Sequence, residues 1–266
     1  AARTSSFAFK GTNTDVRDIA RTLKVAHILE GSVQLAGDKV RVTAQLIDAA
    51  TDVHLWAESY ERDMREILSL QKEVAKTIAG HIKATLAPSE KNELSKKPTI
   101  NPFAHEAYLK GNYFYDQASV AGAWKAITFF DRAIQIEPEF APAYSGKALA
   151  YITIVGFNAL PSKKGWMLVR EWAEKALKID KNNSDAILSM ADVKYNYEWD
   201  WLGAEKAYQQ AIEFNPNNAR AYNWYAIFLS SLGRKEEALL MSQKSLELAP
   251  LSIGPYYNGI IIRVDA

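Results

Sequence analysis

The stretch Ala211-Ile212-Glu213-Phe214-Asn215-Pro216 decides the fold, because copies of it recur through the second part of the chain. In each copy a small residue precedes two apolar residues that stand two positions apart, a pattern typical of a helix that ends before a turn. The other copies are Ala133-Ile134-Gln135-Ile136-Glu137-Pro138, Ala176-Leu177-Lys178-Ile179-Asp180-Lys181 and Ser245-Leu246-Glu247-Leu248-Ala249-Pro250. The four copies end at positions 138, 181, 216 and 250, so their intervals are 43, 35 and 34 residues. A period near 34 residues predicts a stack of helix pairs.

Small residues recur in phase with these helix endings. Gly111, Ala148, Ala191 and Ala226 stand where the first helix of each pair must let the second helix approach. The pattern resembles the tetratricopeptide repeat, which has two antiparallel helices in each unit. The resemblance covers residues 104–266 and implies an all-α superhelix of about four repeats, followed by the first helix of a fifth that starts at Ile253.

The second repeat departs from this pattern. Lys181 replaces the usual proline, Val169 replaces an expected alanine, and the repeat is about nine residues too long for the period. We expect the extra residues to form an extended loop between its two helices, from Phe157 to Gly165.

The resemblance also implies where a partner binds, because the inner face of the first helices lines a concave groove in such superhelices. Asparagine amides can bond a peptide backbone, and tyrosine rings supply contact area at low entropic cost. The expected peptide-binding residues are Tyr108, Asn112, Tyr115, Asp192, Tyr195 and Asn223. The alternative is a groove filled by the protein's own tail or by a neighbouring copy. We expect no Lys or Arg on this face, which disfavours the clamp for a terminal carboxylate that chaperone-tail receptors use.

The first part of the chain changes period several times. Residues 14–23 read as a short helix with Thr14 as its N-cap, and residues 26–35, 40–46 and 53–60 read as three strands joined by short turns. Apolar residues from Ile67 to Leu86 recur at helical spacing. The sequence therefore predicts a small α+β domain, an antiparallel meander plus helices. Gly31 interrupts the first strand, which indicates a bulge, a close backbone approach, or relief of crowding against the helix.

Several phrases in this part resemble the TolB-like N-terminal domain of multidomain bacterial signalling proteins. They are Arg3-Thr4-Ser5-Ser6, Ile28-Leu29-Glu30-Gly31-Ser32-Val33, Arg41-Val42-Thr43-Ala44-Gln45-Leu46-Ile47-Asp48 and His54-Leu55-Trp56-Ala57-Glu58-Ser59-Tyr60-Glu61-Arg62. The resemblance implies a domain over residues 1–86 that lacks its leading strand, with residues 5–8 left at a sheet edge. A polar, Lys-rich linker over residues 87–103 and the repeats over residues 104–266 follow.

Composition excludes several function classes. The 266 residues include no cysteine, so disulfides, thiol nucleophiles and Cys-ligated metals are ruled out. The net charge of +1 gives no reason to expect nucleic-acid binding by this segment, and no apolar run is long enough to span a membrane. The four histidines are scattered, and residues 180–185 lack the glycine and glutamate of a calcium loop. We therefore expect no catalytic residues, no metal and no cofactor.

These observations predict a non-catalytic module for protein–protein interaction, the sensory or docking part of a larger bacterial signalling protein. In proteins with the resembled domain, the upstream partner is often an adenylate or guanylate cyclase, a kinase or a winged-helix domain. The alternatives are the regulatory region of a class III cyclase, or a homodimerisation module. The expected partner is a protein or peptide in the groove. The cellular compartment of the protein stays unknown, with the bacterial cytoplasm favoured over the periplasm.

Overall fold

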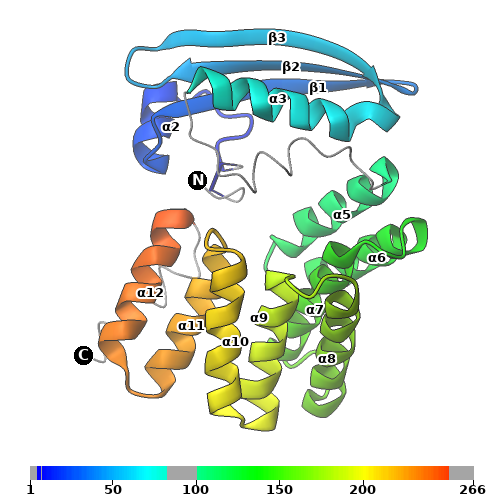
Figure 1. The fold of residues 1–266 in the computed structure, drawn as a ribbon, viewed down its shortest axis with the longest axis vertical. Coiled ribbons are helices and arrows are strands. Elements are labelled where there is room, and N and C mark those ends of the chain that lie inside the picture. Colours follow the sequence, from blue (N-terminus) through cyan, green and yellow to red (C-terminus); the bar gives the residue numbers. More distant parts are fainter. Residues whose placement is uncertain (1–4, 7, 83–100, 252–266) are drawn as a thin grey trace. The chain divides into compact units, whose positions relative to one another are not determined.

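The protein is described by a computed structural model that covers residues 5–6, 8–82 and 101–251. The chain divides into two compact units, residues 9–102 and residues 1–8 with 103–266. The first contains a small three-stranded sheet with helices, and the second is an all-α superhelix of the tetratricopeptide type (Figure 1). The predicted fold class is confirmed. The expected linker and the expected fifth repeat lie almost entirely outside the described residues.

The α+β unit is a sheet covered on one face by helix. Its elements are α2 (Val16–Leu23), β1 (His27–Ala36), β2 (Lys39–Asp48), β3 (Val53–Asp63), the short η1 (Met64–Glu66) and α3 (Ile67–His81). The strands pair in the order β1-β2-β3, all antiparallel. Leu70 of α3 packs with Leu46 and Trp56 of the sheet, which makes the core of this unit. The N-cap of α2 is Asp15 and not Thr14, since the Asp15 carboxylate accepts a hydrogen bond from the Arg17 amide at 2.8 Å.

Gly31 is required by a close approach of two strands. A Cβ atom at this position would lie 2.3 Å from the carbonyl oxygen of Thr43 in β2. The bulge of the sheet lies elsewhere, between Leu46 and Ile47. Of the three interpretations of Gly31, the structure therefore supports the close backbone approach.

The helical unit consists of consecutive helices that pack side by side (Figure 1). They are α5 (Pro102–Tyr115), α6 (Val120–Ile136), α7 (Ala141–Gly156), α8 (Ser162–Ile179), α9 (Ser184–Val193) with the π-helical turn η2 (Lys194–Glu198), α10 (Trp201–Phe214), α11 (Ala219–Ser231) and α12 (Lys235–Leu248). Ala148, Ala191 and Ala226 are fully buried between helices, as their spacing predicts. None of the described helices is long and apolar enough to cross a bilayer.

The long second repeat places its extra residues mainly in helix. The loop between α7 and α8 covers only residues 157–161, so the expected loop to Gly165 is wrong at its end. Gly165 lies inside α8, where a Cβ atom would meet the Val155 side chain at 2.0 Å. The glycine therefore permits close packing of two helices and does not mark a turn.

Ser5 lies in the helical unit. It is fully buried, and its hydroxyl oxygen accepts a hydrogen bond from the Leu251 amide at 3.1 Å. Ser5 and Ser6 are helical and belong to none of the paired strands. The expectation that these residues lie at a sheet edge is therefore wrong.

Candidate functional site

A cavity of about 830 Å³ runs along the first helices of the repeats. Most of its lining comes from α5, α7, α9 with η2, and α11, the helices that the repeat pattern places on the inner face. Tyr208 of α10 and Ser245 of α12 also line it. Asparagines contribute much of the polar surface, and Tyr115, Phe157, Tyr195 and Trp224 contribute aromatic rings. Trp224 lines this cavity and also packs, partly buried, against the core of the third and fourth repeats.

Four of the six expected site residues line the cavity. They are Tyr115, Asp192, Tyr195 and Asn223. The remaining two, Tyr108 and Asn112, do not line it. The Tyr108 ring packs against Phe130 and Phe140, with centroids 5.9 and 5.3 Å away, so its main contacts are with the protein itself.

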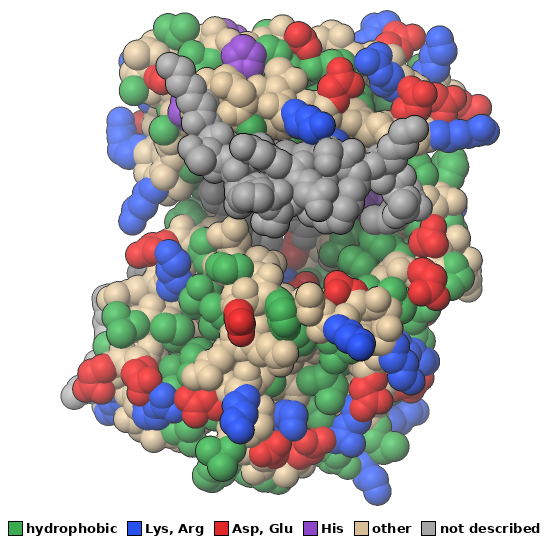
Figure 2. Space-filling model, viewed as in Figure 1, with side chains coloured by type: hydrophobic (Ala, Val, Ile, Leu, Met, Phe, Trp, Pro, Cys, Tyr) green, Lys and Arg blue, Asp and Glu red, His purple; other side chains and the backbone are tan. Residues whose placement is uncertain are grey.

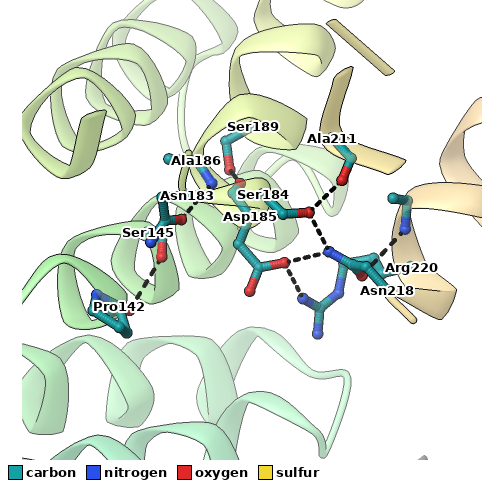
Figure 3. A network of polar contacts seen from close by, with 11 residues as sticks. Pro142, Ser145, Asn183, Ser184, Asp185, Ala186, Ser189, Ala211, Asn218 and Arg220 are labelled. Carbon is teal, nitrogen blue, oxygen red and sulfur yellow. Dashed lines mark hydrogen bonds and ion pairs between the residues drawn. The ribbon is translucent and has the colours of Figure 1, made fainter. Parts of the chain in front are cut away.

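A polar network joins the first turns of α9 and α11 beside the cavity (Figure 3). Asn218 is the N-cap of α11, and its amide nitrogen donates to the Ser184 hydroxyl at 3.0 Å and to Asp185 Oδ1 at 2.9 Å. The Ser184 hydroxyl donates to the Ala211 carbonyl at 2.7 Å. These bonds tie the third repeat to the fourth, so the spacing of two groove-lining helices is fixed.

Arg220 brings a positive charge into the groove, which corrects the expectation that the inner face carries no Lys or Arg. Its guanidinium donates to Asp185 Oδ1 at 3.3 Å and lies 5.0 Å from the centroid of the Tyr115 ring. Burial alone would lower the pKa of Arg220, but Tyr115, Asp185 and Asp116 outweigh it and raise the pKa. The residue was missed because the inner face was projected from positions further along each helix, whereas Arg220 stands in the first turn of α11.

Asp192 is a buried carboxyl in the cavity wall. Its Oδ1 atom accepts a hydrogen bond from the Tyr208 hydroxyl at 2.5 Å. Burial raises the pKa of Asp192 to about 7, although the bond from Tyr208 acts in the opposite direction. The side chain therefore links α9 to α10, and its charge depends on pH near neutrality.

Comparison with known proteins supports the repeat assignment. Residues 207–239 match the family model of the tetratricopeptide repeat. These residues include most of α10, all of α11 and the start of α12. Residues 207–239 are therefore similar to a tetratricopeptide repeat, in agreement with the fold of the helical unit. The resemblance of the α+β unit to the TolB-like domain stays a prediction.

Curated relatives match this chain over part of their own length. "Putative adenylate cyclase 3" of Rhizobium meliloti (strain 1021) is 33% identical over 152 residues, which are 57% of this chain and 26% of that protein. The transcriptional regulator HilA of Salmonella typhimurium is 23% identical over 162 residues, 58% of this chain and 29% of that protein. The chain thus spans between a quarter and a third of the length of either relative.

Solved structures of repeat proteins also resemble the chain. A thermophilic tetratricopeptide protein of Thermus thermophilus, TTC0263, is 16% identical with a TM-score of 0.44, and the match covers 60% of this chain and 99% of that one. YrrB, described as a tetratricopeptide protein with an unusual peptide-binding site, is 23% identical with a TM-score of 0.37, and the match covers 68% and 84%.

Proposed function

We propose that this chain is a non-catalytic protein-interaction module that holds an extended peptide segment in the groove of its helical unit. The observation that carries the proposal is the cavity of about 830 Å³ along the first helices, which is large enough for several peptide residues. Its lining combines amide groups with aromatic rings, the two kinds of group that bind a peptide backbone and its side chains.

The polar groups of the cavity suit backbone recognition. Asn196 and Asn217 line it and are exposed, so their amides can donate to one peptide carbonyl and accept from one peptide N–H. Asn196 already donates to the Asp192 carbonyl at 3.1 Å, which orients its side-chain oxygen. Tyr115, Tyr195 and Trp224 supply the apolar area that excludes water around such bonds.

The curated relatives support a role as a module within a larger regulator. One is named as a cyclase and the other as a transcriptional regulator, so segments similar to this chain occur in proteins with different named activities. A module that binds a partner fits both proteins. Control of a cyclase domain by this segment is the narrower form of the same proposal.

The test is a selection of peptides from a displayed random library with the full chain as bait, followed by measurement of Kd. The variant Tyr115→Ala with Asn223→Ala removes one ring and one amide from the groove. Loss of a central aromatic contact costs about 2 kcal/mol, so the selected peptides should bind about thirtyfold more weakly. Tyr113→Ala is the matched control, because Tyr113 is also on α5 but is 60% exposed and does not line the cavity.

Equal affinity of the selected peptides for the double variant would place the binding site outside the groove. A tight dimer by light scattering that takes up no peptide would favour the homodimerisation alternative. A melting temperature within a few degrees of the parent shows that the variant is folded, since a change of 1 kcal/mol shifts Tm by roughly 2–4 °C in a chain of this size.

A further inference from the structure

Three large apolar side chains are exposed together at the connection between η2 and α10. Trp199, Trp201 and Leu202 are 72%, 49% and 78% exposed. Single exposed apolar residues are common, but three within four positions form a patch that usually has a partner.

The backbone that carries this patch is fixed, and it is strained. Trp199 has a φ of +60°, an unusual value for a bulky residue, and it directly follows the π-helical turn. Asp200 caps α10 by accepting from the Gly203 amide at 2.9 Å, and it binds the Lys194 ammonium at 2.8 Å. A Cβ atom at Gly203 would lie 1.9 Å from the Asp200 carboxylate. These contacts hold a conformation that exposes the tryptophans, and folding alone gains nothing from that exposure.

A second apolar surface lies at the same end of the helical unit. Successive helices run antiparallel, so the α7–α8 and α9–α10 connections share one end, the lower one in Figure 1. At the start of α8 a shallow hollow of about 540 Å³ is lined by Pro161, Met167 and Leu168. An ion pair between Arg170 and Glu198 joins α8 to the tryptophan loop. Figure 2 shows hydrophobic side chains among both basic and acidic side chains at this lower end.

The charges around these surfaces favour a negatively charged partner. The two acids of the loop, Glu198 and Asp200, are already paired with Arg170 and Lys194. Three exposed lysines of α8 and α10 have no ion pair with any residue of the described part of the chain. They are Lys163, Lys164 and Lys206. Lys163 and Lys164 line the apolar hollow together with Glu171, whose charge is paired with Lys175. Lys206 acts electrostatically on Asp200, the residue between the two tryptophans.

We propose that this end of the helical unit docks on the surface of an anionic lipid bilayer. Tryptophan rings prefer the headgroup region, where the apolar ring is buried and the indole N–H stays hydrated. Leu202 enters the acyl boundary beside them, and the three lysines bind anionic headgroups. None of the three apolar residues or the three lysines lines the groove, so variants at these positions leave the side chains of the proposed peptide site unchanged.

The test is flotation of the full chain with vesicles of phosphatidylcholine alone and of phosphatidylcholine with added phosphatidylglycerol. We expect binding to the anionic vesicles, a blue shift of tryptophan emission, and weakening as salt rises. Trp199→Ala with Leu202→Ala should reduce binding about tenfold or more. Lys163→Gln with Lys164→Gln should reduce binding and its salt dependence. Phe214→Ala is the control, because Phe214 is 39% exposed at the opposite end of α10 and should have no effect.

No binding of the parent chain to anionic vesicles would overturn the proposal. Equal binding of the parent and Trp199→Ala with Leu202→Ala would also overturn it. If the patch instead binds an acidic protein, the parent chain will not float with lipid, and the proposal fails in the same way. All these variants change exposed side chains, and circular dichroism verifies that each is folded. Failure here does not affect the peptide proposal, whose readout is peptide affinity in the absence of lipid.

Discussion

The guanidinium of Arg220 lies 5.0 Å from the centre of the Tyr115 ring, so the start of α11 contacts the end of α5. These helices belong to the fourth and the first repeat, and the contact crosses the groove between them. Arg220 is held in this position by its ion pair with Asp185 of α9. The groove is therefore spanned at this point by a side chain of the protein itself, and a bound peptide must pass beside it.

Arg220→Met tests this contact through stability. Methionine keeps the length of the side chain but removes the ion pair with Asp185 and the cation–π contact with Tyr115. We expect a loss of about 1 kcal/mol in the free energy of unfolding, because the pair is only partly buried. Urea unfolding measures it. Arg132→Met, at an exposed position of α6, should keep a free energy of unfolding within about 0.5 kcal/mol of the parent. An equal loss in both variants would contradict a stabilising role for the contacts of Arg220.

Gly111→Ala should destabilise the first repeat. The added Cβ atom would lie 2.5 Å from the ring of Phe130, which is fully buried and cannot move aside cheaply. Overpacking of this kind costs about 1–3 kcal/mol. The control is Gly156→Ala at the end of α7, where nothing lies within 4 Å of the added atom. That change should be neutral or stabilising by up to about 1 kcal/mol, since alanine favours helix. Urea unfolding of both variants decides between these outcomes.

Gly31→Ala should weaken the sheet of the α+β unit. The methyl group would meet the Thr43 carbonyl oxygen at 2.3 Å, so β1 and β2 must separate locally. We expect a loss of roughly 1–3 kcal/mol and faster amide exchange along both strands. Gly80→Ala in α3 has open space around the new atom and should not destabilise. Hydrogen exchange of the strands that is unchanged in Gly31→Ala would refute this account.

Asp192 gives stability a dependence on pH near neutrality. Its pKa is about 7 in the folded protein and near its ordinary 3.8 when unfolded, so between these values the folded state binds more protons. Stability from this group therefore falls as pH rises through that range, by at most about 1.4 kcal/mol per pH unit. Asp192→Asn keeps an acceptor for Tyr208 and removes the titration. Its advantage over the parent should grow as the pH is raised from about 5 to about 7.

The control for this prediction is Asp200→Asn. The bond from Lys194 and then the bond from the Gly203 amide lower the pKa of Asp200, so it stays ionised across the same range. Its difference from the parent should show no slope between about pH 5 and about pH 7. Urea unfolding at several pH values gives both slopes, and a flat difference for Asp192→Asn would mean that the buried carboxyl is ionised throughout.

The sequence predicted the features that depend on periodicity. The spacing of Ala148, Ala191 and Ala226 identified the contacts between helices, because a repeat fixes which residues face a neighbour. Periodicity could not show that Gly165 allows close packing inside a helix, because the sequence does not distinguish a glycine in a helix from a glycine in a turn. It also could not locate Arg220, whose long side chain reaches the groove from the first turn of its helix.

The exposure of Trp199 could not be predicted from the sequence, for a related reason. The π-helical turn before it inserts residues into the helical register, so positions after Lys194 no longer follow the spacing of the other repeats. The positive φ of Trp199 occurs where the π-helical turn ends and directly before Asp200, the N-cap of α10, and a tryptophan in sequence gives no signal for it.

The bond between Ser5 and the Leu251 amide has a consequence for the order of folding. The two residues are 246 positions apart, and the α+β unit lies between them in sequence. Closing a loop of that length has a high entropic cost, so contacts of this kind form late and slow a folding reaction. During synthesis the first residues of the helical unit must wait until its last helix has left the ribosome. The α+β unit can fold during that interval, since its strands are adjacent in sequence.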